Sequence, residues 1–353
     1  MGCEGEMKNR GHSDEKLTPP VGVRAIAAFS GGLDSILAAV LVHRLGVPVT
    51  LLHVQHLFSA DGEGRARLRV SAAHVGLPLR IVDASVEHLE VIRHPRHGYG
   101  RGMNPCIDCR IFMLKVAEQV MEEEGAQFVI SGEVLGQRPK SQHLRALAQA
   151  AEESGLGDRL LRPLSANLLP DTLPVKRGWL RKEDLLSIQG RSRERQLALA
   201  TEYGVTEFPQ PAGGCVLIEP TYAARVRDVF AHDGPENVGV EAFLLMKVGR
   251  HFRLSERAVA IVGRNRGENE TLERFAAGRT RIDPIDVMGP TTLVDGAASA
   301  EDVHHAASLT ARYADHEGRP TIRMKVVDGA GERTIDVAPL TSHDPRIAQW
   351  RIG

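Results

Sequence analysis

Short apolar runs alternate with longer helical segments through residues 23–203, and this alternation predicts the fold class. The runs are bounded by turn residues, as strands are, and the segments between them range from the continuously apolar 36–42 to the mainly polar 62–75. The expected strands are 23–29, 49–54, 79–82, 127–130 and 160–164, and the expected helices are 36–42, 62–75, 110–124, 140–153 and 193–203. Because alternating strands and helices build parallel sheets covered on both faces, we expect a doubly wound α/β domain.

Toward the C-terminus the apolar runs become shorter, and glycine-rich turns separate them. The runs 258–262, 292–294 and 322–327 predict strands of a smaller α+β domain. Cys215 is expected on a short strand that follows the turn at 210–214. We predict four parts: a disordered tail over 1–20, an α/β domain over 21–165, a bridging segment over 166–236 that returns Cys215 to the active site, and an accessory domain over 237–353.

Composition excludes several classes of protein. The 353 residues are 42% hydrophobic and 25% charged, which is ordinary for a globular chain. No run approaches the roughly 20 apolar residues of a membrane helix, and the N-terminus lacks the apolar centre of a signal peptide, so we expect a cytoplasmic protein with no membrane partner. The 4 cysteines are too few for a disulfide scaffold, and Cys3 in the tail is expected to be an incidental surface thiol.

The segment Ser30-Gly31-Gly32-Leu33-Asp34-Ser35 carries the strongest chemical signal. Consecutive glycines after a buried strand let the backbone present N–H groups closely, and the following helix N-terminus adds positive dipole at the same place. Ser30 and Ser35 add hydroxyl donors, and Asp34 suits a Mg²⁺ that bridges it to a phosphate. The alternative is a helix cap without a ligand, in which Ser30 or Asp34 only starts the helix.

This segment lacks the Gly-Lys-Ser/Thr ending of a Walker A loop. It resembles instead the pyrophosphate loop of the PP-loop ATP pyrophosphatases, whose Rossmann-like members adenylate a carbonyl or acyl oxygen and release pyrophosphate. The resemblance implies ATP with Mg²⁺, and it places adenine near the ends of the first two strands. The implied contacts are Ala28, Ser30, Gly31, Gly32, Asp34, Ser35, His53 and Gln55, together with Ser131 and Gly132 in a second strand-to-turn segment.

The cysteines carry a second resemblance. Asn104-Pro105-Cys106-Ile107-Asp108-Cys109-Arg110 is similar to the Asn-Pro-(Cys or Asp)-x-x-Cys-Asn segment of the tRNA thiouridylases, and Gly214-Cys215-Val216 is similar to their Gly-x-Cys-Phe element. Arg110 departs from that pattern, which has Asn at this position. The resemblance implies an ATP-dependent tRNA sulfurtransferase that adenylates a uridine oxygen and then inserts sulfur.

Three thiols leave more than one chemistry open, and we assign Cys106, Cys109, Cys215 and Asp34 as catalytic. In one scheme Cys215 carries a persulfide and another cysteine assists. In the second, favoured by the set of three thiols, all three cysteines hold a 4Fe–4S cluster with one open iron. The third interpretation is a purely structural role or a zinc site. A zinc site would have to recruit a histidine, with His94 and His97 as the candidates, but we expect these two to be exposed loop residues or phosphate contacts.

A near-neutral net charge of -1 conceals two basic tracts. Lys and Arg outnumber Asp and Glu by 12 to 7 over 138–195 and by 9 to 4 over 247–281. Such tracts bind RNA phosphates, although ordinary ion pairs on a solvated surface explain them equally well. Segments 247–253 and 262–269 resemble the RNA-binding domain of NFACT proteins.

The expected partners are therefore tRNA and a sulfur donor, either sulfide or a cysteine desulfurase relay. Two competing functions remain. One is a PP-loop ligase or sulfurtransferase that acts on a small molecule. The other is a non-catalytic RNA-binding protein built on a nucleotide-binding fold.

Overall fold

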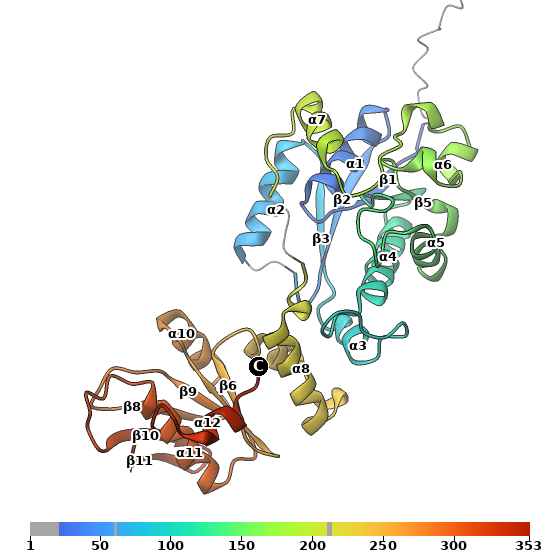
Figure 1. Cartoon of the computed structure of the whole chain (residues 1–353). Coiled ribbons are helices and arrows are strands. Elements are labelled where there is room, and N and C mark those ends of the chain that lie inside the picture. Colours follow the sequence, from blue (N-terminus) through green and yellow to red (C-terminus); the bar gives the residue numbers. More distant parts are fainter. Residues whose placement is uncertain (1–20, 60–61, 210–213) are drawn as a thin grey trace, which may run out of the picture. The chain divides into compact units, whose positions relative to one another are not determined.

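The computed structural model describes residues 21–59, 62–209 and 214–353 (Figure 1). The predicted tail with Cys3 and most of the turn before Cys215 lie outside these residues. Within the described chain, no helix has both the length and the apolar character needed to cross a bilayer.

The chain folds into two compact units that interleave along the sequence. The first comprises the described parts of Met1–Gln55, Ala60–Asp83 and Arg110–Ala212. The second comprises His56–Ser59, Ala84–Cys109 and the described part of Gly213–Gly353. Each unit has its own sheet and its own hydrophobic core.

A five-stranded parallel sheet forms the centre of the first unit. Its strands are β1 (Ala25–Ala28), β2 (Val49–Gln55), β3 (Leu79–Asp83), β4 (Phe128–Ser131) and β5 (Leu160–Leu161), in the order β3-β2-β1-β4-β5. All neighbouring strands pair in parallel. The chain winds outward from β1 in both directions, which confirms the predicted doubly wound α/β fold.

Helices cover both faces of this sheet (Figure 1). They are α1 (Leu33–Arg44), α2 (Gly62–His74), α4 (Cys106–Glu123), α5 (Leu144–Glu153), α6 (Leu173–Lys176) and α7 (Glu194–Tyr203). Nearly every residue of α1 from Leu33 to Val42 is buried, because the helix lies between the sheet and α7. A helix that is apolar all round requires such a buried position. It ends before Gly46, whose φ of 92° is the left-handed conformation that glycine adopts freely.

The second unit contains a six-stranded antiparallel sheet. Its strands are β6 (Arg250–Ser255), β7 (Ala258–Val262), β8 (Thr280–Pro284), β9 (Thr292–Gly296), β10 (Ile322–Asp328) and β11 (Gly331–Val337), in the order β11-β10-β8-β9-β7-β6. The helices of this unit are α3 (His88–Arg93), α8 (Pro220–Asp233), α9 (Val240–Leu245), α10 (Arg266–Arg274), α11 (Ala300–Arg312) and α12 (Pro345–Trp350). Helix α11 packs its apolar face on the sheet, which confirms the expected α+β fold at the C-terminus.

The strand predicted at Cys215 is wrong. The residues Val216–Ile218 form a short 3-10 helix, and α8 follows at Pro220. The turn is closed by a hydrogen bond from the Ile218 N–H to the Cys215 carbonyl, at 3.0 Å. Proline at the first position of a helix is already set to helical φ, so the chain bends into α8 instead of extending.

Candidate functional site

The loop between β1 and α1, in the first unit, is the predicted anion cradle. Gly31 has a φ of 75°, a left-handed conformation that lets the chain turn sharply after the buried strand. Helix α1 then begins at Leu33 with Gly32 as its N-cap, and no side chain caps it. A helix start that lacks a side-chain cap leaves N–H groups available to an anion.

Ser30 and Ser35 shape this loop. The Ser35 hydroxyl donates to the Gly32 carbonyl at 2.7 Å, and the Gly32 N–H donates to the Ser30 hydroxyl at 3.3 Å. The two hydroxyls lie 3.3 Å apart. These bonds hold the loop in its turn without a ligand, so the serines are expected to pre-form the cradle as well as to contact phosphate.

Asp34 lies in the first turn of α1. Its Oδ2 accepts a hydrogen bond from the Gln137 side chain at 3.1 Å. Its Oδ1 is buried and has no hydrogen-bond partner within the described residues. A buried carboxylate oxygen without a partner is costly, and a bound cation would satisfy it. The donor chemistry therefore fits the Mg²⁺ that the sequence analysis places here.

The cradle lies where the strand order reverses. β2 and β3 follow on one side of β1 and β4 and β5 on the other, so the loops after β1 and β4 diverge at the carboxyl end of the sheet. Ligands of open α/β sheets bind at such a switch point. Ala28 ends β1 there, and its register partner on β4 is Ser131, whose hydroxyl accepts the N–H of Glu133 at 3.3 Å.

Gly132 has a packing role that the sequence did not reveal. A Cβ at this position would lie 2.6 Å from the backbone of Asp34 and Ser35. Only glycine permits so close an approach between the end of β4 and the start of α1. The structure therefore places Gly132 against the helix that bears the cradle.

His53 and Gln55 lie on β2. The Nδ1 of His53 donates to the Phe29 carbonyl at 3.0 Å, which ties β2 to the residue that precedes the loop. Burial lowers the pKa of His53, so its ring is neutral at pH 7. Gln55 donates to Asp83 at 3.2 Å across the ends of β2 and β3. His53 thus supports the loop, and Gln55 lies at the strand end where adenine was expected.

A buried ion network adjoins the cradle and was not predicted. Glu133, which follows Gly132, pairs with Arg162 at 2.8 Å, and both are almost completely buried. Arg110 forms a second ion pair with Glu133. Arg110, which departs from the thiouridylase pattern, therefore neutralises the buried carboxylate of Glu133. The sequence contained no signal for this pairing.

The three candidate thiols lie in the second unit and are all partly exposed. Cys106 and Cys109 occupy the first turn of α4, and Cys215 precedes α8. Burial raises the pKa of the Cys215 thiol, the charge of Cys106 raises it further, and Lys247 acts in the opposite direction. Cys106 therefore lies within electrostatic range of Cys215. Three accessible thiols in one unit are a donor set that fits an iron–sulfur cluster.

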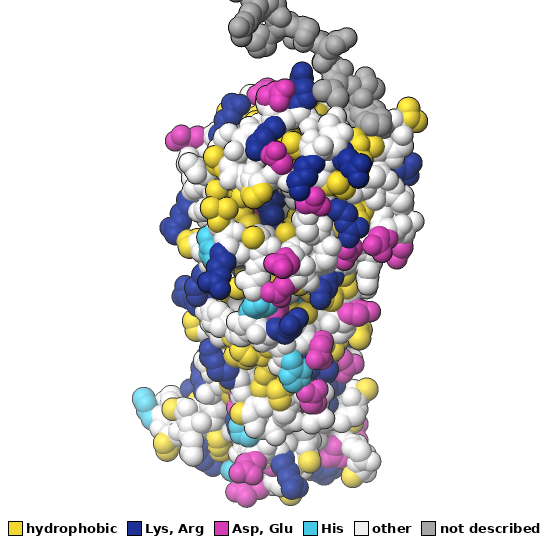
Figure 2. Space-filling view, turned by 90° about the vertical axis from the view of Figure 1, so that its right-hand side faces the viewer, with side chains coloured by type: hydrophobic (Ala, Val, Ile, Leu, Met, Phe, Trp, Pro, Cys, Tyr) yellow, Lys and Arg dark blue, Asp and Glu magenta, His cyan; other side chains and the backbone are white. Residues whose placement is uncertain are grey.

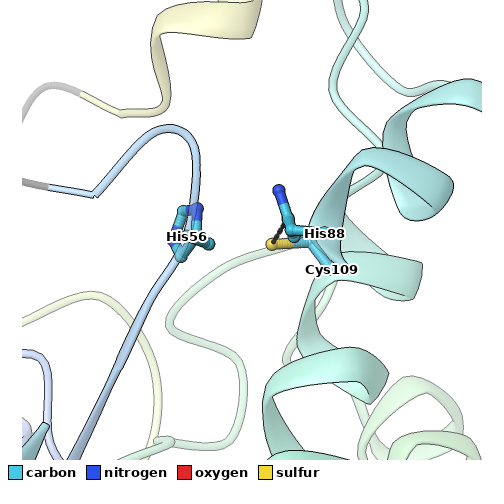
Figure 3. Close-up of side chains that lie close together, drawn as sticks. All are labelled: His56, His88 and Cys109. Atoms are coloured by element: carbon cyan, nitrogen blue, oxygen red, sulfur yellow. Dashed lines mark hydrogen bonds between the residues drawn. The ribbon is translucent and has the colours of Figure 1, made fainter. Parts of the chain in front are cut away.

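Two histidines lie beside Cys109, and the sequence analysis missed both. The ligand atoms of His56, His88 and Cys109 all lie within 4.8 Å of one another (Figure 3). His88 Nε2 is 3.2 Å from Cys109 Sγ, and the two imidazole rings are 4.6 Å apart. Burial, and then the nearby His56, lower the pKa of His88 to about 3, so its ring is neutral at pH 7. No spacing motif links residues 56, 88 and 109, which explains the omission.

The two histidines considered as possible zinc ligands, His94 and His97, both pair with carboxylates. His94 forms a hydrogen-bonded pair with Glu236. The His97 ring lies 2.9 Å from Asp108, and this buried carboxylate also accepts the backbone N–H groups of Arg96 and His97. Asp108, between the two cysteines, therefore fixes the loop before α4.

Basic side chains of the two tracts differ in their pairing. In the second tract Arg264 pairs with Glu268 and Arg279 with Asp295, and Arg253 and Arg281 also bind carboxylates. In the first tract, ion pairs are formed by Arg159, Arg162, Lys176, Arg181 and Lys182, whereas Arg191 and Arg195 are exposed and form no ion pair with any described residue. Basic and acidic side chains are interspersed over the face shown in Figure 2. The first tract thus offers more unpaired cations than the second.

Comparison with known families confirms the PP-loop and the NFACT resemblances. Residues 21–167 match the family described as thiamine biosynthesis protein (ThiI). Residues 249–351 match the family described as NFACT protein RNA binding domain. The PP-loop resemblance and the NFACT resemblance therefore hold for these two segments of the chain.

Two of the similar proteins each match less than half of this chain. A probable tRNA sulfurtransferase of Thermus thermophilus is 31% identical over 142 residues, which are 38% of this chain and 34% of that protein. GMP synthase (glutamine-hydrolyzing) of Aquifex aeolicus is 30% identical over 145 residues, 40% of this chain and 28% of that protein. The matches thus span about a third of these curated relatives or less. A 4-thiouridine synthetase in complex with RNA and bound ATP has a TM-score of 0.35 at 20% identity, over 54% of this chain and 53% of that chain.

Proposed function

We propose that the protein is an ATP-dependent tRNA sulfurtransferase that converts a uridine into a thiouridine. The observation that carries this proposal is the uncapped start of α1 beside Asp34, whose Oδ1 is buried without a hydrogen-bond partner in the described chain. This arrangement suits a nucleotide polyphosphate with its cation. The similarity to a probable tRNA sulfurtransferase supports the choice of substrate.

In the first step, the uridine carbonyl oxygen attacks the α-phosphorus of ATP, and pyrophosphate leaves. The N–H groups at the start of α1 would hold the departing phosphates, and Asp34 would hold Mg²⁺ against them. Fixed donors of this kind stabilise charge as it develops on the leaving group. The intraloop bonds of Ser30 and Ser35 keep the donors in place before ATP binds.

In the second step, a sulfur nucleophile attacks the activated carbon, and AMP leaves. Cysteine suits this role because its thiolate is a strong nucleophile. If Cys215 carries a persulfide, its terminal sulfur forms the new C–S bond. Cys106 then attacks the Sγ of Cys215, the S–S bond to the transferred sulfur breaks, and thiouridine leaves; a dithiol reductant reduces the resulting Cys106–Cys215 disulfide to two thiols. Alternatively, a 4Fe–4S cluster held by Cys106, Cys109 and Cys215 would supply an open iron for sulfide.

Binding of tRNA is proposed for the C-terminal sheet and for the unpaired arginines of the first basic tract. The match to an RNA-binding domain over residues 249–351 supports this role. Phosphate contacts of this kind position RNA without reading its sequence.

The direct test is sulfur incorporation under anaerobic conditions. Purified protein, ATP and Mg²⁺ are incubated with unmodified tRNA in two parallel reactions, one supplied with sulfide and one with a cysteine desulfurase, cysteine and a dithiol reductant, and nucleosides are analysed by mass spectrometry. Thiouridine should form with the wild type and be lost with Asp34→Asn, while Asp158→Asn, an exposed residue paired with Lys176, keeps activity. Failure of the wild type to thiolate any tRNA in a total pool would refute the proposal.

A small-molecule substrate is the second candidate, because the GMP synthase of Aquifex aeolicus is about as similar to this chain as the sulfurtransferase is. In that case AMP release should depend on a metabolite and be indifferent to tRNA. If tRNA binds but ATP is never consumed, the protein is instead a non-catalytic RNA-binding protein.

A further inference from the structure

The three thiols of the second unit lie in two different environments. Cys109 contacts the His88 ring, whereas Cys215 is influenced electrostatically by Cys106. We propose that His56, His88 and Cys109 bind a single Zn²⁺ ion, without Cys106 or Cys215 as a ligand. This inference rests on the proposed function in one respect, since it leaves Cys106 and Cys215 as the thiols for sulfur transfer.

The spacing of the donor atoms supports the site. Tetrahedral zinc has Zn–S bonds of about 2.3 Å and Zn–N bonds of about 2.0 Å, so its nitrogen and sulfur ligands lie roughly 3.5 Å apart. His88 Nε2 and Cys109 Sγ are already 3.2 Å apart. All three ligand atoms lie within 4.8 Å of one another. Side-chain rotations that move these atoms by about an ångström would bring them to three corners of a tetrahedron around the Zn²⁺ ion.

Three separate segments hold these side chains (Figure 3). His56 directly follows β2, and its loop is fixed by the Ser59 hydroxyl, which accepts the His56 N–H at 2.8 Å. His88 begins α3, where its N–H donates to the Ala84 carbonyl at 3.0 Å. Cys109 lies in the first turn of α4. A ligand set on anchored backbone loses little conformational entropy when the metal binds.

The largely apolar surroundings of these three side chains favour the binding of a metal ion. His88 is fully buried, and Phe58 lies edge-on to its ring at 5.9 Å. Leu57 and Leu89 belong to the same apolar cluster. Such a shell excludes water on one side and lowers the local dielectric constant, which strengthens the attraction between Zn²⁺ and a thiolate.

The donor set selects the metal. Two imidazoles and one thiolate are borderline-soft ligands that suit zinc, and three protein ligands leave a fourth position for water or hydrosulfide. Binding requires the Cys109 thiol to release one proton to solvent, and no electron is transferred. Within the described chain, this is the only group of three or more His, Cys, Asp or Glu side chains so closely placed.

The experiment measures Zn²⁺ binding to the metal-free, full-length protein under reducing conditions. The wild type should bind one equivalent, and Co²⁺ in its place should give thiolate-to-metal absorption. Cys109→Ser should abolish that absorption, and His56→Gln and His88→Gln should each weaken Zn²⁺ binding by more than about 100-fold. The matched controls Cys215→Ser and His94→Gln should bind as the wild type does.

Folding is monitored by circular dichroism, and the partly exposed His56 keeps the test valid if the buried His88→Gln variant unfolds. Zinc binding that survives both histidine substitutions, or that is lost with Cys215→Ser, would overturn the site. Iron and sulfide bound in a 4:4 ratio and dependent on all three cysteines would also overturn it. Thiouridine formation is assayed in parallel: a zinc-bound protein that never thiolates tRNA contradicts the proposed function alone, and an active protein that binds no zinc contradicts this site alone.

Discussion

Two uncharged residues, Gly132 and His53, help to position the loop between β1 and α1, one by close packing and the other by a hydrogen bond. Gly132 brings the end of β4 against the backbone of Asp34 and Ser35, and the His53 ring donates to the Phe29 carbonyl beneath the loop. Both positions were predicted as nucleotide contacts, which stays a prediction. The structure shows that each also sets the position of the cradle.

Gly132→Ala tests this packing. The added Cβ would meet backbone atoms at 2.6 Å, and backbone cannot move aside as a flexible side chain can. We expect a loss of about 3 kcal/mol in the free energy of unfolding, at the upper end of overpacking costs, together with weaker ATP binding.

Urea denaturation and ATP titration measure the two effects. The control is Gly329→Ala, because a Cβ there meets no atom within 4 Å. Equal stability of the two variants would contradict the packing role of Gly132.

At the scale of elements, a buried ion network joins three parts of the first unit. Glu133 follows β4, Arg162 follows β5, and Arg110 lies in α4. Arg162 also donates to the Leu147 carbonyl of α5 at 2.9 Å. Burial lowers the pKa of Arg162 to about 10, which leaves it charged at pH 7. The carboxylate therefore balances two cations that the fold removes from water.

Glu133→Ala is expected to destabilise the first unit by about 3–5 kcal/mol, because it leaves buried guanidinium groups without their counter-charge. The comparison variant is Glu183→Ala, whose side chain is 71% exposed and lies 3.8 Å from Arg181. Its effect should be within about 0.5 kcal/mol. The midpoints of thermal unfolding distinguish the two, and similar midpoints would show that the network contributes nothing.

For the whole molecule, the total charge says little about RNA binding. The arginines of the C-terminal tract largely form ion pairs, whereas Arg191 and Arg195 of the first tract are exposed. Unpaired cations release more counterions when RNA binds, because they have no competing carboxylate. The proposed tRNA binding should therefore depend more on the first tract than the sequence counts alone indicate.

The double variant Arg191→Ala/Arg195→Ala should weaken tRNA binding by about 3–10-fold and lower the slope of log affinity against log salt by roughly 1–2. Fluorescence anisotropy at several KCl concentrations measures both quantities. Arg266→Ala serves as the control, since this exposed arginine pairs with Glu270. An unchanged salt slope in the double variant would contradict the role of this surface.

The amino-acid sequence was sufficient for the parallel sheet, the glycine loop and the cysteine motifs, because each depends on neighbours in the chain. Hydrophobic periodicity determines strands and helices locally, and the loop combines a strand end with a helix start. The strand at Cys215 was mispredicted because Pro220 and a 3-10 turn redirect the chain into α8.

Only the tertiary structure decided which distant side chains meet. His56, His88 and Cys109 come from three segments with no common spacing, and Glu133 meets Arg110 and Arg162 through the strand order. The interleaving of the two units along the chain was equally invisible, since residues 56–59 and 84–109 pack with the C-terminal residues. Contacts of this kind depend on how buried surfaces match in space, and no local pattern records that.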